Sequence, residues 1–125
     1  MDKSPDMHSH EGVFVWVSPL TGVLQSAAVH RTRRGQAAGG VRWWTYDTVA
    51  SFLTDGLRLA RGMTHKNALA GLWWGGGKGV MAKGTGRDPA AAAGAAGDDV
   101  AAAVATHRKD VYAEYGRLVS SLQGV

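Results

Sequence analysis

The chain contains no cysteine among its 125 residues, so disulfide bonds and thiolate chemistry are excluded. It has no apolar run that approaches the roughly 20 residues needed by a membrane-spanning helix. Its first ten residues are polar and include Pro5, which does not fit the apolar centre of a signal peptide. These absences predict a soluble, cytoplasmic protein with a flexible tail over residues 1–11 and one folded domain over residues 12–125.

The formal net charge of +4 and a pI near 9.8 indicate a moderately basic chain, which is compatible with an acidic ligand or with nucleic acid. A basic run from Arg31 to Arg34 precedes Trp43 and Trp44, and these residue types supply the phosphate contacts and base stacking of a nucleic-acid surface. Because the run is short, nucleic-acid binding is the minor alternative. His8 and His10 are more typical of a solvated tail than of a metal site.

Alternating valines and aromatic residues predict a strand at Val13–Val17. A turn rich in Ser, Pro and Gly follows, and a second strand is predicted at Val23–Arg31. Residues 35–40 are expected to form a loop, which ends in two adjacent glycines. A third strand is predicted at Val41–Tyr46, so the first part of the chain indicates a small sheet.

A helix is expected next, because Asp47 or Thr48 can cap the free amides of a first helical turn. Apolar residues then recur at helical spacing as far as Met63, and Gly71 is expected to end the helix. From residue 72 to 82 the sequence predicts a glycine-rich turn that opens into a short strand at its apolar end.

The last part of the chain predicts a loop and a second long helix. Residues 84–97 are rich in glycine and alanine and are expected to form a loop or linker. The helix is expected to begin near Asp98 and Asp99, where carboxylates favour the helix dipole, and to end at Gly124. Its apolar ridge is formed by Val100, Val104, Val111, Tyr115, Leu118 and Leu122. The order of elements predicts an α/β fold, a small mixed sheet with helices packed on it.

Two lysines are the strongest candidates for chemistry. Lys66 lies near the end of the first predicted helix, and Lys78 follows three consecutive glycines, Gly75 to Gly77. Glycines without a Cβ let a ligand approach the backbone closely. Two ammonium groups that converge on one pocket lower each other's pKa, and burial lowers it further. One lysine could then act as a general base near neutral pH while the other stays cationic and binds a carboxylate.

Known nucleotide motifs do not account for these glycines. A phosphate-binding loop requires glycine five residues before the Gly-Lys pair and serine or threonine after it, whereas this chain has Leu72 and Gly79 at those positions. The dinucleotide fingerprint Gly-x-Gly-x-x-Gly does not occur in the sequence.

The chain resembles the Glu/Leu/Phe/Val (amino-acid) dehydrogenase family, most closely its leucine and phenylalanine dehydrogenase branch. The resemblance is carried by the run from Arg61 to Val80, with its Met-Thr-x-Lys-Asn-Ala and Gly-Gly-Gly-Lys-Gly motifs, and by Gly39-Gly40-x-Arg42. Asp88-Pro89 and Tyr115-Gly116-Arg117 are also similar to the family pattern. Together these segments span roughly residues 12–124.

The resemblance implies a reaction and roles for five residues. The reaction is the reversible oxidative deamination of an L-amino acid to a 2-oxo acid and ammonia, with NAD or NADP as the hydride acceptor. Lys78 is implied as the catalytic lysine that activates water, and Lys66 as the ligand of the substrate α-carboxylate. Gly39, Gly40 and Met63 are implied to line the substrate pocket. The residues after Gly40 favour an apolar substrate rather than glutamate.

The resemblance also implies that the sequence holds the substrate-binding and oligomerisation part, without the dinucleotide-binding domain. We therefore expect the chain alone to be inactive and to form homo-oligomers. A catalytically inactive self-association module is the main alternative, with the edge strand Val13–Val17 as a contact surface. No metal and no membrane partner is expected. Trp73 and Trp74 stand where the family has smaller residues and are expected to crowd the pocket.

Overall fold

The computed structural model describes residues 9–85 and 98–122. Its centre is a five-stranded mixed sheet formed by β1 (Gly12–Val17), β2 (Leu24–Arg31), β3 (Ala37–Ala38), β4 (Val41–Trp44) and β5 (Gly75–Ala82). β1 and β2 are antiparallel, as are β2 and β5, whereas β3 and β4 both run parallel to β5. The segment from β3 to β4 therefore follows one edge of β5, and β1 lies at the other end of the sheet.

Two long helices accompany the sheet. Helix α1 spans Val49–Leu69 and helix α2 spans Asp98–Ser120. Thr48 is the N-cap of α1, where its side-chain oxygen accepts a hydrogen bond from the Ser51 amide and the Ser51 side chain bonds back to the Thr48 amide. This reciprocal pair resolves the choice between Asp47 and Thr48 in favour of Thr48.

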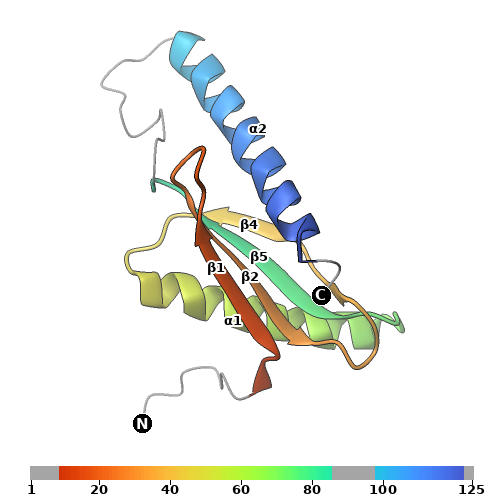
Figure 1. The fold of residues 1–125 in the computed structure, drawn as a ribbon. Helices are drawn as coiled ribbons and strands as arrows, with labels where there is room; N and C mark the ends of the chain where they lie inside the picture. Colours follow the sequence, from red (N-terminus) through yellow and green to blue (C-terminus); the bar gives the residue numbers. More distant parts are fainter. Residues whose placement is uncertain (1–8, 86–97, 123–125) are drawn as a thin grey trace.

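The helices lie on opposite faces of the sheet, as Figure 1 shows, with α1 behind it and α2 in front. The α1 side buries two apolar clusters, one around Ala28, Leu57 and Ala60 and the other around Phe52, Val80 and Ala82. The α2 side buries a third cluster, formed by Val23, Met81, Val111 and Tyr115. The expected α/β class, a small mixed sheet with helices packed on it, is confirmed.

Helix α2 covers the sheet with its C-terminal half only. Val111 and Tyr115 are buried, whereas the described side chains of residues 101, 102, 105 and 106 are exposed. In Figure 1 the N-terminal half of α2 extends beyond the end of the sheet. The apolar ridge predicted for this helix is thus partly confirmed, at Val111 and Tyr115, which pack against the sheet.

The structure corrects the boundaries of several elements. Gly75 to Gly79 do not form a turn before a short strand, because β5 already begins at Gly75. The expected loop at residues 35–40 contains the two-residue strand β3. Helix α2 ends at Ser120, and Gly124 lies outside the described residues, as do Asp88-Pro89 and most of the 84–97 segment. A glycine run has little strand preference of its own, so its neighbours decide its conformation.

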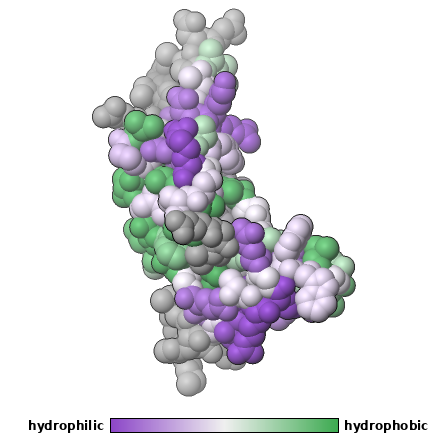
Figure 2. Space-filling view, turned by 45° about the vertical axis from the view of Figure 1, so that its right-hand side comes forward, coloured by the Kyte–Doolittle hydropathy of each residue, from purple (hydrophilic) through white to green (hydrophobic). Residues whose placement is uncertain are grey.

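Residues 1–8 of the expected tail lie outside the described part, but its last three residues contact the domain. His10 Nε2 lies 2.9 Å from the Leu57 carbonyl oxygen, and the Glu11 carboxylate accepts hydrogen bonds from the amide and hydroxyl of Thr32. None of the described helices is long and apolar enough to cross a membrane. On the face seen in Figure 2, hydrophobic and hydrophilic side chains are interspersed.

Candidate functional site

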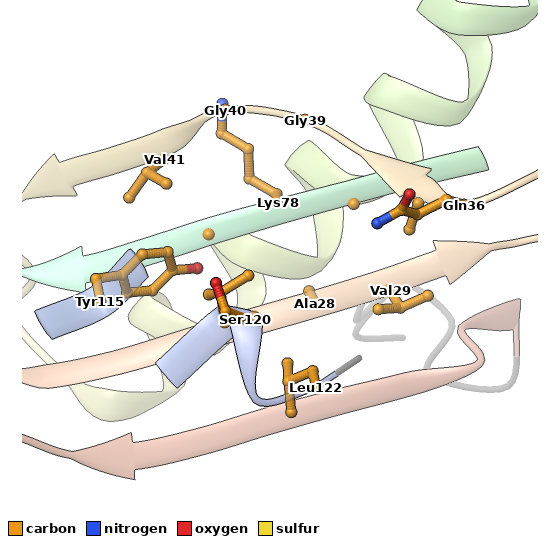
Figure 3. A pocket seen from close by; sticks show the side chains of 15 residues that line it. Ala28, Val29, Gln36, Gly39, Gly40, Val41, Lys78, Tyr115, Ser120 and Leu122 are labelled. Carbon is orange, nitrogen blue, oxygen red and sulfur yellow. The ribbon is translucent and has the colours of Figure 1, made fainter. Parts of the chain in front are cut away.

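Lys78 lies in the middle of β5, between two glycines, and its side chain points to the α1 side of the sheet. Gly76 and Val80, two residues away on either side, face α1, whereas Gly79 faces Tyr115 on α2. Figure 3 shows the Lys78 side chain rising from β5 towards Gly40. A Cβ placed on Gly40 would stand 3.4 Å from Lys78 Nζ, so the glycine leaves the ammonium accessible.

The segment from Ala38 to Gly40 lies close against β5. A Cβ on Gly39 would collide with the Gly77 carbonyl oxygen and would stand 3.2 Å from Met63 Cγ. Gly40 accepts a 3.0 Å hydrogen bond from the Gly79 amide, and Asn67 of α1 donates one of 2.7 Å to the Gly75 carbonyl. These contacts bring Gly39 and Gly40 close to β5 and Lys78, and they place Met63 next to Gly39.

The environment of Lys78 lowers its pKa below the ordinary value of 10.5. The largest cause is burial, followed by the positive charges of Arg42 and Lys66, while Asp55 acts in the opposite direction. The influence of Lys66 places the two predicted lysines within electrostatic range of each other. Within residues 9–85 and 98–122, no acceptor is hydrogen-bonded to Lys78 Nζ. A half-buried ammonium without an acceptor is suited to bind an anion or to lose a proton.

An ion pair that the sequence does not reveal lies beside Lys78. Arg42 and Asp55 are 3.4 Å apart, and the Tyr46 hydroxyl donates a hydrogen bond to the same Asp55 carboxylate. Burial raises the pKa of Tyr46 above its usual range, and Asp55 adds to the effect. The only sequence signal for Asp55 is an acidic residue beside Phe52 and Gly56, which face the sheet. The roles of Arg42 and Asp55 therefore emerge from the tertiary structure.

A cavity of about 280 Å³ opens on the α2 side of the same strand. It is bounded by Gly39, Gly40, Lys78 and the C-terminal end of α2, as the close-up in Figure 3 shows. Its walls are largely small or apolar and include Ala27, Val29, Gly77, Gly79, Tyr115, Val119 and Leu122. Lys66 and Met63 do not line it, so the cavity meets the predicted site only at Lys78 and the two glycines.

The positions of the tryptophans bear on two of the sequence interpretations. Trp73 and Trp74 do not crowd the cavity, because they are 78% and 51% exposed and belong to the turn before β5. Trp43 packs against Tyr112 of α2, whereas Trp44 faces the α1 side under Arg42. Trp43 and Trp44 therefore do not form one stacking surface, which weakens the nucleic-acid alternative. The described residues contain no group of three or more potential metal ligands.

The fold is that of an α/β domain whose central strand carries a half-buried lysine between two glycines. The sequence profile of the dimerisation domain of the Glu/Leu/Phe/Val dehydrogenases matches residues 22–114. The chain belongs to this family.

Individual relatives agree with the family assignment. The chain is 43% identical over 79 residues to leucine dehydrogenase of Bacillus subtilis. This alignment covers 63% of this chain and 22% of the relative. It is 43% identical over 76 residues to valine dehydrogenase of Streptomyces coelicolor, covering 61% of this chain and 21% of that protein. The chain thus spans about a fifth of the length of these relatives.

A solved structure extends the likeness to the fold. The crystal structure of L-tryptophan dehydrogenase from Nostoc punctiforme superimposes with a TM-score of 0.66 at 34% sequence identity. The superposition covers 93% of this chain and 29% of that chain. Because the superposition covers most of this chain, the arrangement described above is that of an amino-acid dehydrogenase N-terminal domain.

Proposed function

We propose that this chain forms the substrate-binding and subunit-contact part of an NAD(P)-dependent L-amino-acid dehydrogenase. The observation that carries the proposal is Lys78, a half-buried ammonium with a lowered pKa and no hydrogen-bonded acceptor in the described part of the chain. The reaction is the reversible conversion of an L-amino acid to a 2-oxo acid and ammonia. An apolar amino acid is favoured, because the relatives are named for leucine, valine and tryptophan.

Lys66 and Lys78 have different roles in this proposal. Lys66 is exposed, and its ammonium group attracts the α-carboxylate of the substrate. Lys78 in its neutral form accepts a proton from water while the water oxygen attacks the imino carbon of the oxidised substrate. Arg42 and burial favour that neutral form, which brings the basicity of the lysine closer to neutral pH. In this proposal the substrate lies near Gly39 and Gly40, which adjoin Lys78, and near Met63, which adjoins Gly39.

NAD or NADP would accept the hydride from the substrate Cα. The described residues do not fit this cofactor, because no strand among them leads through a Gly-x-Gly-x-x-Gly turn into a helix. No residue of this chain is therefore assigned to the cofactor. We expect the 125-residue chain alone to form no NADH, and a measurable rate of NADH formation would contradict that expectation.

Binding of a 2-oxo acid tests the proposal on the chain itself. Titration of the ¹⁵N-labelled chain with 2-oxopentanoate is expected to shift the amide signals of Gly39, Gly40 and Gly77. Lys66→Ala is expected to weaken this binding at least about tenfold, because a charge-assisted contact is removed. Lys83→Ala, which removes an exposed lysine at the end of β5, is the control and should leave binding unchanged. Equal losses in the two variants would refute the assigned role of Lys66.

Turnover tests the role of Lys78. In a complete dehydrogenase that contains this domain, Lys78→Ala is expected to abolish turnover while 2-oxo acid binding is partly kept. Normal rates in that variant would show that another group is the base.

The proposed contact between subunits is supported by exposed apolar side chains on the edge strand β1. Val15 and Val17 are 48% and 61% exposed on this strand, which pairs with β2 along one edge only in the described part of the chain. An exposed apolar strand edge is a surface on which a second copy can add a strand. We expect the sedimentation coefficient to rise with concentration and Val15→Lys to suppress that rise. Unchanged sedimentation of the unsubstituted chain over a hundredfold concentration range would remove this part of the proposal.

A further inference from the structure

Arg42 and Lys78 project from neighbouring strands to the same side of the sheet. In the parallel pairing of β4 with β5, Arg42 lies opposite Val80, which is two residues beyond Lys78. Because side chains alternate along a strand, positions 78 and 80 of β5 and position 42 of β4 all face α1. The guanidinium is therefore the next cation along the sheet from the ammonium of Lys78.

Among Arg42, Lys66 and Lys78, only Arg42 forms an ion pair with an acidic residue of the described part of the chain. Asp55 of α1 lies 3.4 Å from it, and the side chains of Arg42 and Asp55 are 36% and 21% exposed. Tyr46 and Arg42 both contact the Asp55 carboxylate, which holds it in place. Lys66 and Lys78 have no comparable partner in the described part of the chain, so two cations remain available and the third is neutralised.

Space for a ligand group adjoins this ion pair. A hollow of about 330 Å³ is lined by Arg42, Tyr46, Asp55 and Arg58, among others. The guanidinium thus borders an open, polar volume on the α1 side of the sheet. A carboxylate that entered the hollow would meet Arg42, but it would also meet the negative charge of Asp55.

We propose that Asp55 is a specificity-determining residue, which neutralises Arg42 and so excludes amino acids and 2-oxo acids that carry a second carboxylate. The α-carboxylate is attracted by Lys66 and Lys78, whereas a side-chain carboxylate that approaches Arg42 is repelled by Asp55, which already pairs with that guanidinium. The inference rests on the proposed function, because it assumes that a 2-oxo acid binds beside these lysines. It goes beyond that function by assigning the choice between apolar and acidic substrates to one ion pair.

Two five-carbon 2-oxo acids that differ by one carboxylate test the inference on the full chain. The dissociation constants of 2-oxopentanoate and 2-oxoglutarate are measured by ¹⁵N amide shifts at pH 7 and constant ionic strength. Asp55→Asn is expected to tighten 2-oxoglutarate binding about tenfold relative to 2-oxopentanoate, because the released guanidinium can pair with the second carboxylate. The unsubstituted chain is expected to prefer 2-oxopentanoate.

Matched variants separate the ion pair from a general change in charge. Asp47→Asn removes the same charge from an exposed position that lines the same hollow, and the ratio of the two constants should not change. Adding Arg42→Gln to Asp55→Asn should cancel the gain for 2-oxoglutarate. Asp55→Ser is a second neutral replacement, to be used if Asp55→Asn does not fold.

The outcomes distinguish this inference from the proposed function. A ratio that stays within twofold of the unsubstituted chain in every folded Asp55 variant overturns the inference, whatever Lys66→Ala does. Equal tightening in Asp47→Asn and Asp55→Asn overturns it as well, because the effect would then be nonspecific. If 2-oxopentanoate binds and Lys66→Ala abolishes that binding, the proposed function stands even when the Asp55 result is negative.

Discussion

The two sides of the sheet are built differently, although the same strands supply both. On the α1 side, helix and sheet approach so closely that Gly76 lies against the backbone of Ala60 and Thr64. On the α2 side, the ring of Tyr115 and the side chains of Met81 and Val111 separate the helix from the strand. On the α1 side, helix and sheet are thus in close contact through their backbones, whereas on the α2 side they pack through side chains.

The two sides also differ in the hydrogen bonds made by their buried ionisable side chains. On the α2 side the buried Glu114 accepts hydrogen bonds from the Ser18 hydroxyl and the Leu20 amide, so its lone pairs are used within the fold. On the α1 side Lys78 has electrostatic neighbours but no hydrogen-bonded acceptor in the described part of the chain. A satisfied buried charge stabilises a structure, whereas an unsatisfied one costs free energy and is typical of a site. The comparison therefore supports the proposal that the functional site lies on the α1 side.

The largest change in stability is expected from a substitution that disrupts the close packing of α1 on the sheet. A Cβ at Gly76 would collide with the Thr64 amide nitrogen and stand 2.5 Å from the Ala60 carbonyl oxygen, and this backbone cannot yield without moving α1. We expect Gly76→Ala to lower the free energy of unfolding by about 3 kcal/mol, the upper end for overpacking. Gly62→Ala is the control in α1, where nothing stands within 4 Å, and it should stabilise the domain by up to about 1 kcal/mol. Urea unfolding measures both, and equal values would contradict the close-fit description.

A second prediction concerns His30, which lies on the α1 side and is 6% exposed. Its Nδ1 is 2.8 Å from the Thr64 hydroxyl, and burial, with the neighbouring positive charges of His10 and Arg31, lowers its pKa to about 4. The unfolded chain takes up a proton near pH 6.5 and the folded chain does not, so stability falls between pH 6.5 and 4. We expect His30 to account for about 2 kcal/mol of that loss.

Denaturant unfolding at several pH values separates His30 from the carboxylates that titrate in the same range. His30→Gln should be less stable at pH 7 but should lose less stability on acidification than the unsubstituted chain. His65→Gln, at an exposed position of α1, should keep the full pH dependence. Identical slopes for the two variants would mean that His30 does not stay neutral in the fold.

A smaller effect is expected on the α2 side. The Tyr115 hydroxyl donates a 3.0 Å hydrogen bond to the Ser26 carbonyl oxygen, and burial raises the pKa of Tyr115 to about 12. Tyr115→Phe removes this single bond and keeps the ring, so we expect a loss of about 1 kcal/mol in thermal or urea unfolding. Tyr112→Phe, on the same helix, is the matched control. A loss above that of Gly76→Ala would reverse the ranking of the two sides.

The smallest effect has the opposite sign and concerns Lys78. Because its pKa is lowered in the fold, charged Lys78 destabilises the domain below that pKa, and the cost disappears as the pH rises towards 10.5. We expect Lys78→Met to stabilise the domain at pH 7 by less than about 1 kcal/mol, since the side chain is partly solvated. This stabilisation should decrease in alkaline buffer. Lys83→Met should change neither the stability at pH 7 nor its pH dependence. A Lys78→Met variant that is less stable than the unsubstituted chain at pH 7 would contradict the free-energy cost assigned to charged Lys78.

Much of the fold was predictable from local patterns. The alternation at Val13–Val17, the helical spacing before Met63 and the cap at Thr48 each depend on residues close in the chain, so the sequence predicted those elements within a few residues. The motifs around Lys66 and Lys78 identified the family through residue types alone. The assignment of roles to Lys66, Lys78, Gly39, Gly40 and Met63 remains a prediction.

The sequence by itself determined both helices and every strand except β3, the positions of both lysines and the family. Only the tertiary structure decided that Gly75 to Gly79 form a strand, because β2 pairs with it on one side and β3 and β4 pair with it on the other. It also decided that Arg42 pairs with Asp55 and that Lys78 has no hydrogen-bonded acceptor among the described residues. These outcomes depend on which side chains from distant segments share one side of the sheet, and local patterns carry no information on that.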